Sequence, residues 1–245
     1  MIPKTIHLIW FSTDSYPIDI KVCIDTWKRR LPDYTIKVWD MEAARAIGIP
    51  FIDEALDARK WAFAADVVRF YAVWKEGGVY MDSDIFLYRR FDDLMEMGSF
   101  VTVNELLSPN DTKAGLQAAF FMGEEGNEFC RRMVELYRSR NFSEFLALMD
   151  DKKNYSKIIS PYQMLYIAEE YGYTMNDKLQ QLSEITVMPT IYLLPNKHHW
   201  KRTDKTVGMH RVAGNWKKKP FLKRLEYKIK KGCFVLKYYL YSRYM

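Results

Sequence analysis

The chain has 245 residues, which suits one large α/β domain or one domain with a small appendage, and its 49% hydrophobic content excludes global disorder. The formal net charge of +6 is unevenly placed: residues 217–245 hold ten Lys and Arg against one acidic residue and so carry +9, which leaves −3 on the rest. A nucleic-acid-binding domain usually shows its basic residues on the folded body, so no nucleic-acid partner is expected.

Apolar runs with β-branched residues alternate with segments of helical periodicity through the first half of the chain. Gly77-Gly78 is a common stop at the end of a helix, and Pro161 suits the first turn of one. This alternation favours a mostly parallel sheet with helices on both faces. In chain order, the sequence predicts a strand at 5–11, a helix at 22–30, a strand at 35–39, a helix at 61–76, strands at 79–81, 85–88, 100–103 and 118–122, helices at 127–138, 143–149 and 161–171, and strands at 185–188 and 207–212.

Cysteine usage and hydropathy indicate a cytoplasmic chain. The three cysteines, Cys23, Cys130 and Cys233, are widely spaced and form no Cys-x-x-Cys pair, which predicts reduced thiols and no structural zinc. The first residues do not read as a charged leader followed by a long apolar run, so no signal peptide is expected. No stretch of about 18 apolar residues occurs, so no segment is expected to span a membrane.

Asp82 and Asp84 stand one residue apart at the end of the predicted strand 79–81. In open parallel sheets, ligands bind at the carboxyl ends of the strands. Two close carboxylates repel each other unless a cation is present, and Mn²⁺ and Mg²⁺ take oxygen ligands of this kind. A solvated turn is the alternative, because Asp is common in turns. The buried helix and the apolar strand that precede the pair favour a metal and diphosphate site.

The predicted helix 61–76 is apolar on almost all sides, so we expect it to be buried. Asp66 and Arg69 lie inside it, three residues apart and on one face. Burying either charge alone is costly. The two residues are therefore either a structural ion pair or part of the site, in which Asp66 accepts hydrogen bonds from sugar hydroxyls and Arg69 contacts hydroxyls or the diphosphate.

These patterns resemble a known family, the glycosyltransferases with a sugar-binding region containing a DXD motif, glycosyltransferase family 32. Bacterial capsular polysaccharide glycosyltransferases and fungal Golgi mannosyltransferases belong to it, and the glucosyltransferase domains of the large clostridial toxins are more distantly similar. The specific match runs from Ala62 through Gly77-Gly78 to Asp84. Shorter matches lie at 2–11, 32–40, Ser160-Pro161 and 210–216, so the resemblance covers most of residues 2–216.

The resemblance implies a GT-A fold with a mostly parallel central sheet, a nucleotide-sugar donor, a divalent cation (Mn²⁺ or Mg²⁺), a glycan acceptor and retention of the anomeric configuration. A UDP-sugar is favoured over GDP-mannose as the donor. Asp66, Arg69 and Asp84 would be catalytic, with Asp66 and Arg69 holding the transferred sugar. Asp82, which also lies near the donor ribose, would bind the metal together with Asp84 and His210.

The same resemblance assigns further residues to the donor nucleotide. Trp10 matches the aromatic residue that stacks on the base, although a plain core position is the alternative. His210 likewise has a structural role as its alternative, because a single histidine is more often structural. Many relatives have Gly-Ser-Trp where this chain has Gly214-Asn215-Trp216. Asn215 can still donate to a phosphate oxygen, and Trp216 matches a tryptophan near the diphosphate.

Residues 217–245 form a basic, aromatic tail that we separate from a glycosyltransferase domain at 1–216. An amphipathic basic helix suits the surface of an anionic membrane, which would make the acceptor a lipid-linked glycan at the inner face of the plasma membrane. A helix that packs on the body with a solvated charged face is the alternative. The apolar stripe of this helix, interrupted at Gly232, consists of Leu222, Leu225, Ile229, Cys233, Leu236 and Leu240.

Two other functions stay open. A nucleotide-sugar hydrolase or pyrophosphorylase could use the same carboxylates, but the Gly-rich phosphate loop usual in pyrophosphorylases does not occur near the N-terminus. A non-catalytic carbohydrate- or membrane-binding protein would not need Asp66 and Arg69 inside a buried helix. For the transferase, retention requires either a carboxylate nucleophile or front-face attack by the acceptor hydroxyl. No nucleophile can be assigned from the sequence, so we prefer front-face attack, as the family resemblance suggests.

Overall fold

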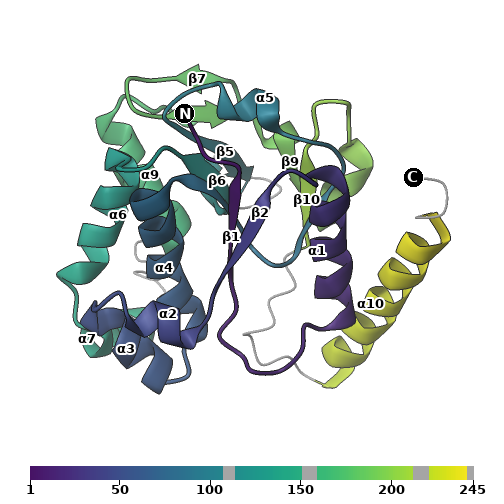
Figure 1. The fold of residues 1–245 in the computed structure, drawn as a ribbon, viewed down its shortest axis with the longest axis horizontal. Coiled ribbons are helices and arrows are strands. Elements are labelled where there is room, and N and C mark those ends of the chain that lie inside the picture. Colours follow the sequence, from purple (N-terminus) through teal and green to yellow (C-terminus); the bar gives the residue numbers. More distant parts are fainter. Residues whose placement is uncertain (107–113, 151–158, 212–220, 242–245) are drawn as a thin grey trace.

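The computed structural model describes residues 1–106, 114–150, 159–211 and 221–241 of the chain. Within these ranges, helices cover both faces of a seven-stranded sheet, and a three-stranded sheet lies beside it (Figure 1). The molecule is therefore a layered α/β protein, as its sequence predicts.

The large sheet is mostly parallel. Its strands, in order across the sheet, are β2 (Thr35–Trp39), β1 (Thr5–Ile9), β3 (Gly78–Met81), β6 (Ala114–Gly123), β5 (Phe100–Leu106), β8 (Thr186–Met188) and β7 (Gln180–Gln181). The pairs β1–β2, β1–β3 and β5–β8 are parallel, whereas β6 and β7 are antiparallel to their neighbours. Five of the seven strands thus run in one direction, and their carboxyl ends share one edge.

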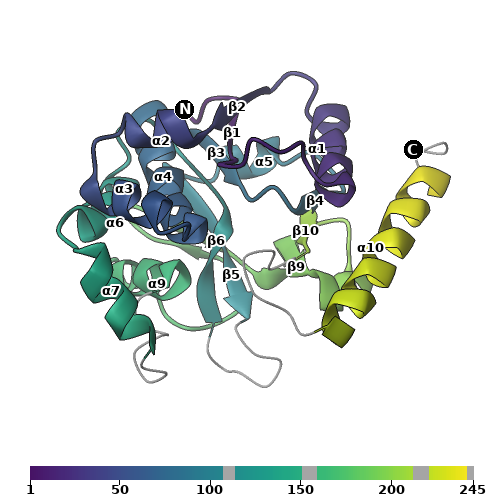
Figure 2. The same ribbon diagram turned by 90° about the horizontal axis from the view of Figure 1, so that it is seen from below.

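The helices divide between the two faces of this sheet. Figure 2 shows one group gathered on one side of the sheet and two long helices on the other. The first group contains α2 (Met41–Arg45), α3 (Pro50–Asp57), α4 (Trp61–Glu76), α6 (Glu128–Arg138), α7 (Phe142–Asp150) and α9 (Ser160–Glu170). The two long helices on the other side are α1 (Ile18–Arg30) and α10 (Phe221–Tyr241), and a short helix, α5 (Asp92–Met95), lies near the beginning of β5.

Each face of the sheet has its own apolar core. On the α4 side, the ring of Phe70 stacks on that of Phe121 with centroids 4.7 Å apart, and both side chains are fully buried. On the α1 side, the buried Trp27 donates from Nε1 to the carbonyl of Ile85 at 2.7 Å. Burying one such large side chain stabilises the fold by about 1.5–3 kcal/mol, so the two apolar cores fix the sheet between the helices on its two faces.

The turn from α4 into β3 depends on two glycines. Gly77 and Gly78 have φ of 61° and 105°, which side chains rarely allow, and a Cβ on Gly78 would lie 2.6 Å from the carbonyl oxygen of Thr5. The buried His7 fixes the same turn, because its Nε2 lies 2.7 Å from the carbonyl oxygen of Gly77. Trp39 donates from Nε1 to His7 Nδ1 at 3.1 Å, so Nε2 carries the proton and donates.

A three-stranded sheet follows the end of β3. It contains β4 (Ile85–Leu87), β10 (Gly208–His210) and β9 (Leu193–Pro195), with β10 in the middle. The short 3₁₀ helices η1 (Thr190–Tyr192) and η2 (Asn196–Lys201) flank β9. The sheet is important for the site because β10 pairs antiparallel with β4, which places His210 opposite Ile85.

Helix α10 packs against α1 and this small sheet (Figures 1 and 2). Tyr238 is buried and its hydroxyl donates to Asp25 of α1. Lys231 reaches the fully buried Asp19 of α1, with Nζ 2.6 Å from Oδ1. Arg211 donates from Nη1 to Oδ2 of the same carboxylate at 3.1 Å. One buried acid therefore connects α1, α10 and the residue after β10.

Most predicted elements are confirmed, and several bounds are corrected. The strand 35–39 and the helix 61–76 have the predicted bounds, while the helix predicted at 22–30 begins at Ile18, directly after Pro17. Strand β6 runs antiparallel, a direction that apolar patterning does not encode. The predicted interruption at Gly232 is wrong: α10 continues through it. A glycine inside a helix costs about 1 kcal/mol, which the packing of neighbouring side chains on α1 offsets.

The described ranges contain no helix whose length and hydropathy would let it cross a membrane. All three cysteines are free, with Cys23 and Cys130 buried and Cys233 exposed.

Candidate active site

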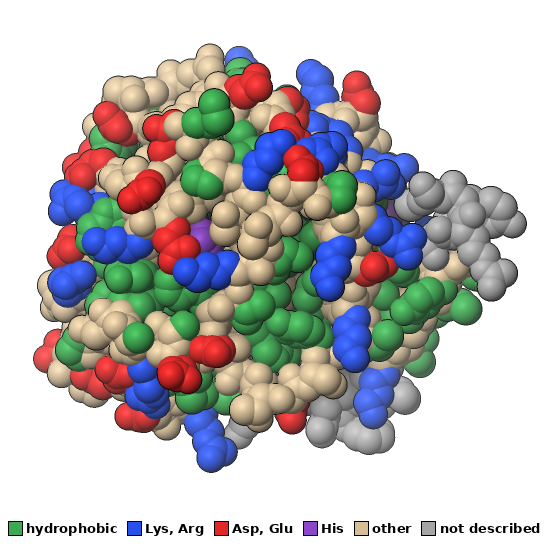
Figure 3. All heavy atoms as spheres, in the orientation of Figure 1, with side chains coloured by type: hydrophobic (Ala, Val, Ile, Leu, Met, Phe, Trp, Pro, Cys, Tyr) green, Lys and Arg blue, Asp and Glu red, His purple; other side chains and the backbone are tan. Residues whose placement is uncertain are grey.

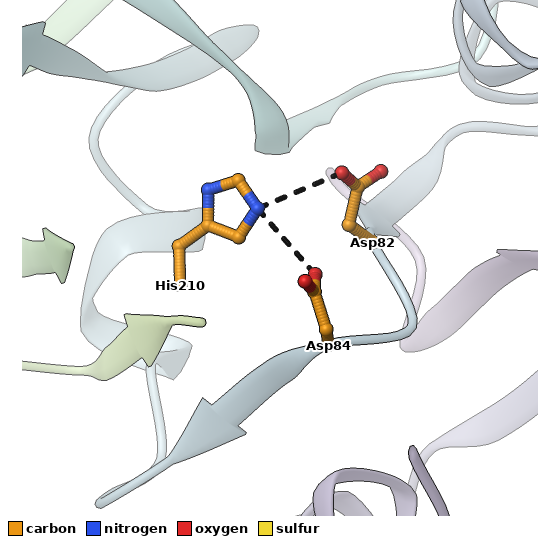
Figure 4. Close-up of side chains that lie close together, drawn as sticks. All are labelled: Asp82, Asp84 and His210. Atoms are coloured by element: carbon orange, nitrogen blue, oxygen red, sulfur yellow. Dashed lines mark ion pairs between the residues drawn. The ribbon is translucent and has the colours of Figure 1, made fainter. Parts of the chain in front are cut away.

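Asp82, Asp84 and His210 form a cluster at the edge where β3 ends (Figure 4). His210 Nε2 lies 3.4 Å from Asp84 Oδ1 and 3.8 Å from Asp82 Oδ2, and one ligand atom from each residue lies within 4.8 Å of the others. The side chains of Asp84 and His210 are 12% and 13% exposed, so the cluster is recessed and still open to a ligand. The structure brings together the three residues expected to bind a metal.

Backbone hydrogen bonds fix this cluster from three elements. The amide of Asp82 donates to the carbonyl of Ala119 in β6 at 2.8 Å, which holds the end of β3. The amide of Ile85 donates to the carbonyl of Asp82 at 3.0 Å, closing a turn that directs both carboxylates to one side. The amide of Arg211 donates to the carbonyl of Asp84 at 3.2 Å, so the end of β10 is attached to the same turn.

The two carboxylates of the cluster favour a proton on His210. Burial alone would lower the pKa of His210, but its hydrogen bond to Asp84 and the charges of Asp84 and Asp82 raise that pKa to about 9. A divalent ion would take the place of this proton. Two carboxylates and one imidazole nitrogen are ligands that Mn²⁺ accepts, and Mg²⁺ accepts the oxygens. These residues therefore fit a divalent cation.

Asp66 and Arg69 lie beside the cluster, on α4. Arg69 Nη2 lies 2.9 Å from Asp66 Oδ1, and Arg69 Nη1 lies 3.6 Å from Asp82 Oδ1. Arg69 also donates to the carbonyls of Ala65 at 3.1 Å and Ala118 at 2.7 Å, so its guanidinium is held in one orientation. Burial raises the pKa of Asp66, against the opposite effect of Arg69. The ion pair thus contributes to the fold and also holds the Arg69 guanidinium next to Asp82.

Three residues that sequence reasoning did not assign to the site interact with it. The hydroxyl of Tyr80 donates to Asp82 Oδ1 at 2.5 Å, and the Tyr80 ring faces the Arg69 guanidinium at 4.9 Å. Ser160 hydrogen-bonds to Asp66. Glu105, at the end of β5, interacts electrostatically with His210 and Asp82, and burial raises its pKa. Two of them had a signal in the sequence: Tyr80 stands two residues before Asp82, on the same side of an extended chain, and Ser160 belongs to the Ser160-Pro161 match.

Of the residues expected to stack on the nucleotide base or contact the diphosphate from outside the metal cluster, the structure describes Trp10. Trp10 directly follows β1, which pairs with β3, the strand that leads to Asp82. Its indole is half-buried, donates from Nε1 to the carbonyl of Asp14 at 3.2 Å and meets the Tyr16 ring edge-on, with centroids 4.8 Å apart. Asn215 and Trp216 lie outside the described residues.

A cavity of about 250 Å³ opens next to His210. Its lining combines apolar side chains with polar ones, among them Asn104, Glu105 and Gln117 from the large sheet. Asp177 and Thr190 close another side, where both oxygens of the Asp177 carboxylate accept hydrogen bonds from Thr190 at 2.6 Å. This cavity offers donors and acceptors for a ligand rich in hydroxyl groups.

Comparison with known proteins supports a glycosyltransferase. Residues 17–101 match the model of the family described as the glycosyltransferase sugar-binding region containing a DXD motif. Inositol phosphoceramide mannosyltransferase 3 of Schizosaccharomyces pombe is 33% identical over 108 residues, which cover 41% of this chain. The match spans 29% of the length of that curated relative.

The fold has relatives among solved structures. The PaToxG glycosyltransferase superposes with a TM-score of 0.50 and 19% identity, covering 68% of this chain and 70% of its own. This likeness identifies the fold as the GT-A type. The family match over residues 17–101 thus supports the predicted resemblance to glycosyltransferases whose sugar-binding region contains a DXD motif.

Proposed function

We propose that this chain is a retaining, metal-dependent glycosyltransferase that moves a hexose from a nucleotide-sugar to a polysaccharide or a lipid-linked glycan. The observation that carries this proposal is the cluster of Asp82, Asp84 and His210 next to the buried pair Asp66–Arg69. A structural ion pair would not require two further carboxylates and a histidine beside it, because the two carboxylates repel each other and cost free energy unless a positive charge compensates them.

Asp82, Asp84 and His210 would hold the divalent ion. A bound Mn²⁺ or Mg²⁺ would supply a Lewis acid that stabilises the negative charge developing on the leaving diphosphate. Tyr80 keeps Asp82 in place through the 2.5 Å hydrogen bond. Asp82 is thereby oriented before the donor binds, which reduces the reorganisation needed during the reaction.

Arg69 and Asp66 would hold the transferred sugar and the diphosphate. The guanidinium of Arg69 is fixed by two backbone carbonyls, and its charge lies 3.6 Å from Asp82, where the donor phosphates would come to rest. The carboxylate of Asp66 has one oxygen against Arg69 and can accept hydrogen bonds from sugar hydroxyls with the other. Its side chain is 15% exposed, so these bonds would form in a region with little water.

The donor nucleotide would extend from this cluster toward Trp10, with Asn215 and Trp216 near the diphosphate. For retention, we prefer front-face attack. In this route the acceptor oxygen bonds to the anomeric carbon as the bond to the diphosphate breaks, and the departing phosphate takes the acceptor proton. Among the described residues, Glu105 is a further carboxylate whose charge interacts with the cluster, and nothing in its geometry places it as a nucleophile.

GDP-mannose is the second candidate donor, after a UDP-sugar. The name of the Schizosaccharomyces pombe relative identifies that protein as a mannosyltransferase acting on inositol phosphoceramide. By analogy, a lipid-linked acceptor and a mannose donor are consistent with this chain, whereas a capsular polysaccharide acceptor follows from the sequence resemblance alone.

We further propose that residues 1–216 are the catalytic domain and that residues 217–245 attach it to the inner face of the plasma membrane. In the described part of α10, the predicted stripe lies on the outside: Ile229, Leu236 and Leu240 are 60%, 62% and 59% exposed, and Cys233 is exposed. Figure 3 shows hydrophobic side chains on the outer surface at α10. Lysines next to this stripe suit an anionic leaflet.

The test is a donor panel assayed for hydrolysis and transfer with and without Mn²⁺. UDP-sugars and GDP-mannose would each be incubated with the wild type and with Asp84→Asn, which keeps size and hydrogen bonding while removing the ligand charge. We expect metal-dependent release of the nucleoside diphosphate from one donor, and its loss in the variant with unchanged thermal unfolding. Release without any metal dependence would contradict the metal role, and no release from any donor would favour a non-catalytic binding protein.

A further inference from the structure

A groove of about 580 Å³ runs along one flank of α10, outside the candidate active site. It lies between α10 on one side and η2 with the small sheet on the other. Its walls are aromatic, and the rings of Phe86, Tyr88, Trp200, Phe234 and Tyr238 line it. Trp200 is 70% exposed, which is unusual for the largest apolar side chain and indicates a surface that a ligand or a membrane can cover.

The charges that line this groove are all positive. Arg202 and Lys237 both line it, and no acidic residue does. Among the described residues, neither has a carboxylate within salt-bridge distance. The guanidinium of Arg202 lies over the ring of Tyr88, 4.6 Å from its centroid, which orients it without neutralising it. The groove therefore combines an apolar wall with two uncompensated cations.

The groove adjoins the exposed apolar stripe of α10. The inner face of the helix, with Phe234 and Tyr238, packs on the body, and the outer face carries Leu236 and Leu240. At about 100° per residue, Lys237 lies between these two faces. A membrane in contact with the outer stripe would thus bring its headgroup layer to the mouth of the groove.

We propose that this groove binds the phosphate of an anionic phospholipid headgroup, with Arg202 and Lys237 as the phosphate ligands and Trp200 at the interface. The inference rests on the membrane attachment proposed above. A phospholipid fits for two reasons: its anion complements the two cations, and its chains would lie beside the outer stripe. Tryptophan is enriched at the headgroup level of membranes because its ring is apolar with one polar edge.

Calorimetry with a soluble lipid distinguishes binding of the headgroup in the groove from general attraction to a charged surface. Dihexanoyl phosphatidylglycerol, kept below its micelle concentration, would be titrated into the full chain by calorimetry. The variants are Arg202→Gln and Lys237→Gln, and the matched control is Lys228→Gln. Lys228 is exposed on α10 nine residues from Lys237, which places it on the opposite flank of the helix, outside the groove. We expect each groove variant to lose about fivefold in affinity, the effect of one charge worth about 1 kcal/mol, and the control to bind like the wild type.

Flotation with vesicles completes the test. On vesicles containing phosphatidylglycerol, Lys228→Gln and Lys237→Gln should both bind about fivefold more weakly, because both lysines face a charged leaflet. Vesicles of phosphatidylcholine alone should bind the wild type weakly, and thermal unfolding of each variant checks that it folds.

Three outcomes would overturn the proposal. Arg202→Gln could bind the soluble lipid as tightly as the wild type does, or the Lys228→Gln control could lose as much affinity for it as the groove variants. Inorganic phosphate could also bind as tightly as the lipid, which would indicate a site for free anions. Donor hydrolysis by the wild type is measured separately. Hydrolysis without lipid binding overturns the groove and leaves the transferase standing, whereas lipid binding without hydrolysis supports the groove and contradicts the transferase.

Discussion

Replacing Asp19 with Asn tests how helix α10 is held to the body. Asp19 is 1% exposed, and its carboxylate is shared by two cations, with Arg211 at 3.1 Å and Lys231 of α10 at 2.6 Å. Asparagine has nearly the same shape but no charge. The substitution would leave two cations facing one amide, which offers a single acceptor oxygen.

The size of the effect follows from the burial of each partner. A hydrogen bond between charged groups contributes about 1.5–3 kcal/mol where water is excluded, which applies to Arg211 with a side chain 6% exposed. The side chain of Lys231 is 25% exposed, so solvent screens its ion pair with Asp19, which contributes about 1 kcal/mol to stability. We therefore expect Asp19→Asn to lower the free energy of unfolding by about 3 kcal/mol, within the range for breaking a buried ion pair.

The assay is urea unfolding of the full chain, followed by fluorescence, with Asp57→Asn as the control. Asp57 pairs with Arg45 on the surface and its side chain is 70% exposed, so its loss should change stability by less than about 1 kcal/mol. The double variant Asp19→Asn, Lys231→Met should be destabilised by less than the sum of the two single variants, because both remove the same contact. A loss below about 1 kcal/mol in Asp19→Asn would refute the role of this carboxylate.

Three further predictions concern the site and its support. Tyr80→Phe removes the hydrogen bond that orients Asp82 and should weaken Mn²⁺ binding about tenfold, as measured by titration of the metal-free protein. His7→Leu leaves the indole N–H of Trp39 and a backbone carbonyl unpaired in the core, and urea unfolding should show a loss of about 2–4 kcal/mol. Burial opposes ionisation of Asp19, but Lys231 and Arg211 outweigh it and lower the pKa of Asp19. Its contribution to stability is therefore present above its ordinary pKa of 3.8 and is lost as the pH falls below it. The wild type should accordingly lose more stability than Asp19→Asn between pH 5 and pH 3.

The sequence predicts the centre of the site because its signals are local. The helix 61–76, the glycine turn and the strand that ends at Asp82 follow one another directly, so periodicity and turn chemistry are enough to place Asp66 and Asp82 at one sheet edge. His210 is different. It reaches Asp84 through the pairing of β10 with β4, two short strands far apart in the chain, and the prediction came from the family resemblance.

Other features escape sequence reasoning because they depend on tertiary contacts. Patterning detects the strand at 118–122 and cannot give its direction, which here is antiparallel. Glu105 has no local signature, since its relation to the site arises from the packing of β5 beside it. For α10, the sequence leaves two alternatives open. The structure shows the helix packed on the body through Tyr238, with the described part of the predicted stripe exposed, and membrane binding stays a proposal.

The connection between α10 and the metal cluster affects how the tail can be studied. Arg211 bonds to the carboxylate that anchors α10 and, through its amide, to the carbonyl of Asp84. Truncating the chain before α10 would therefore disturb the neighbour of two proposed metal ligands, and lost activity in such a truncation would be ambiguous. Polar substitutions at the exposed Leu236 and Leu240 would test the proposed membrane attachment without removing the helix.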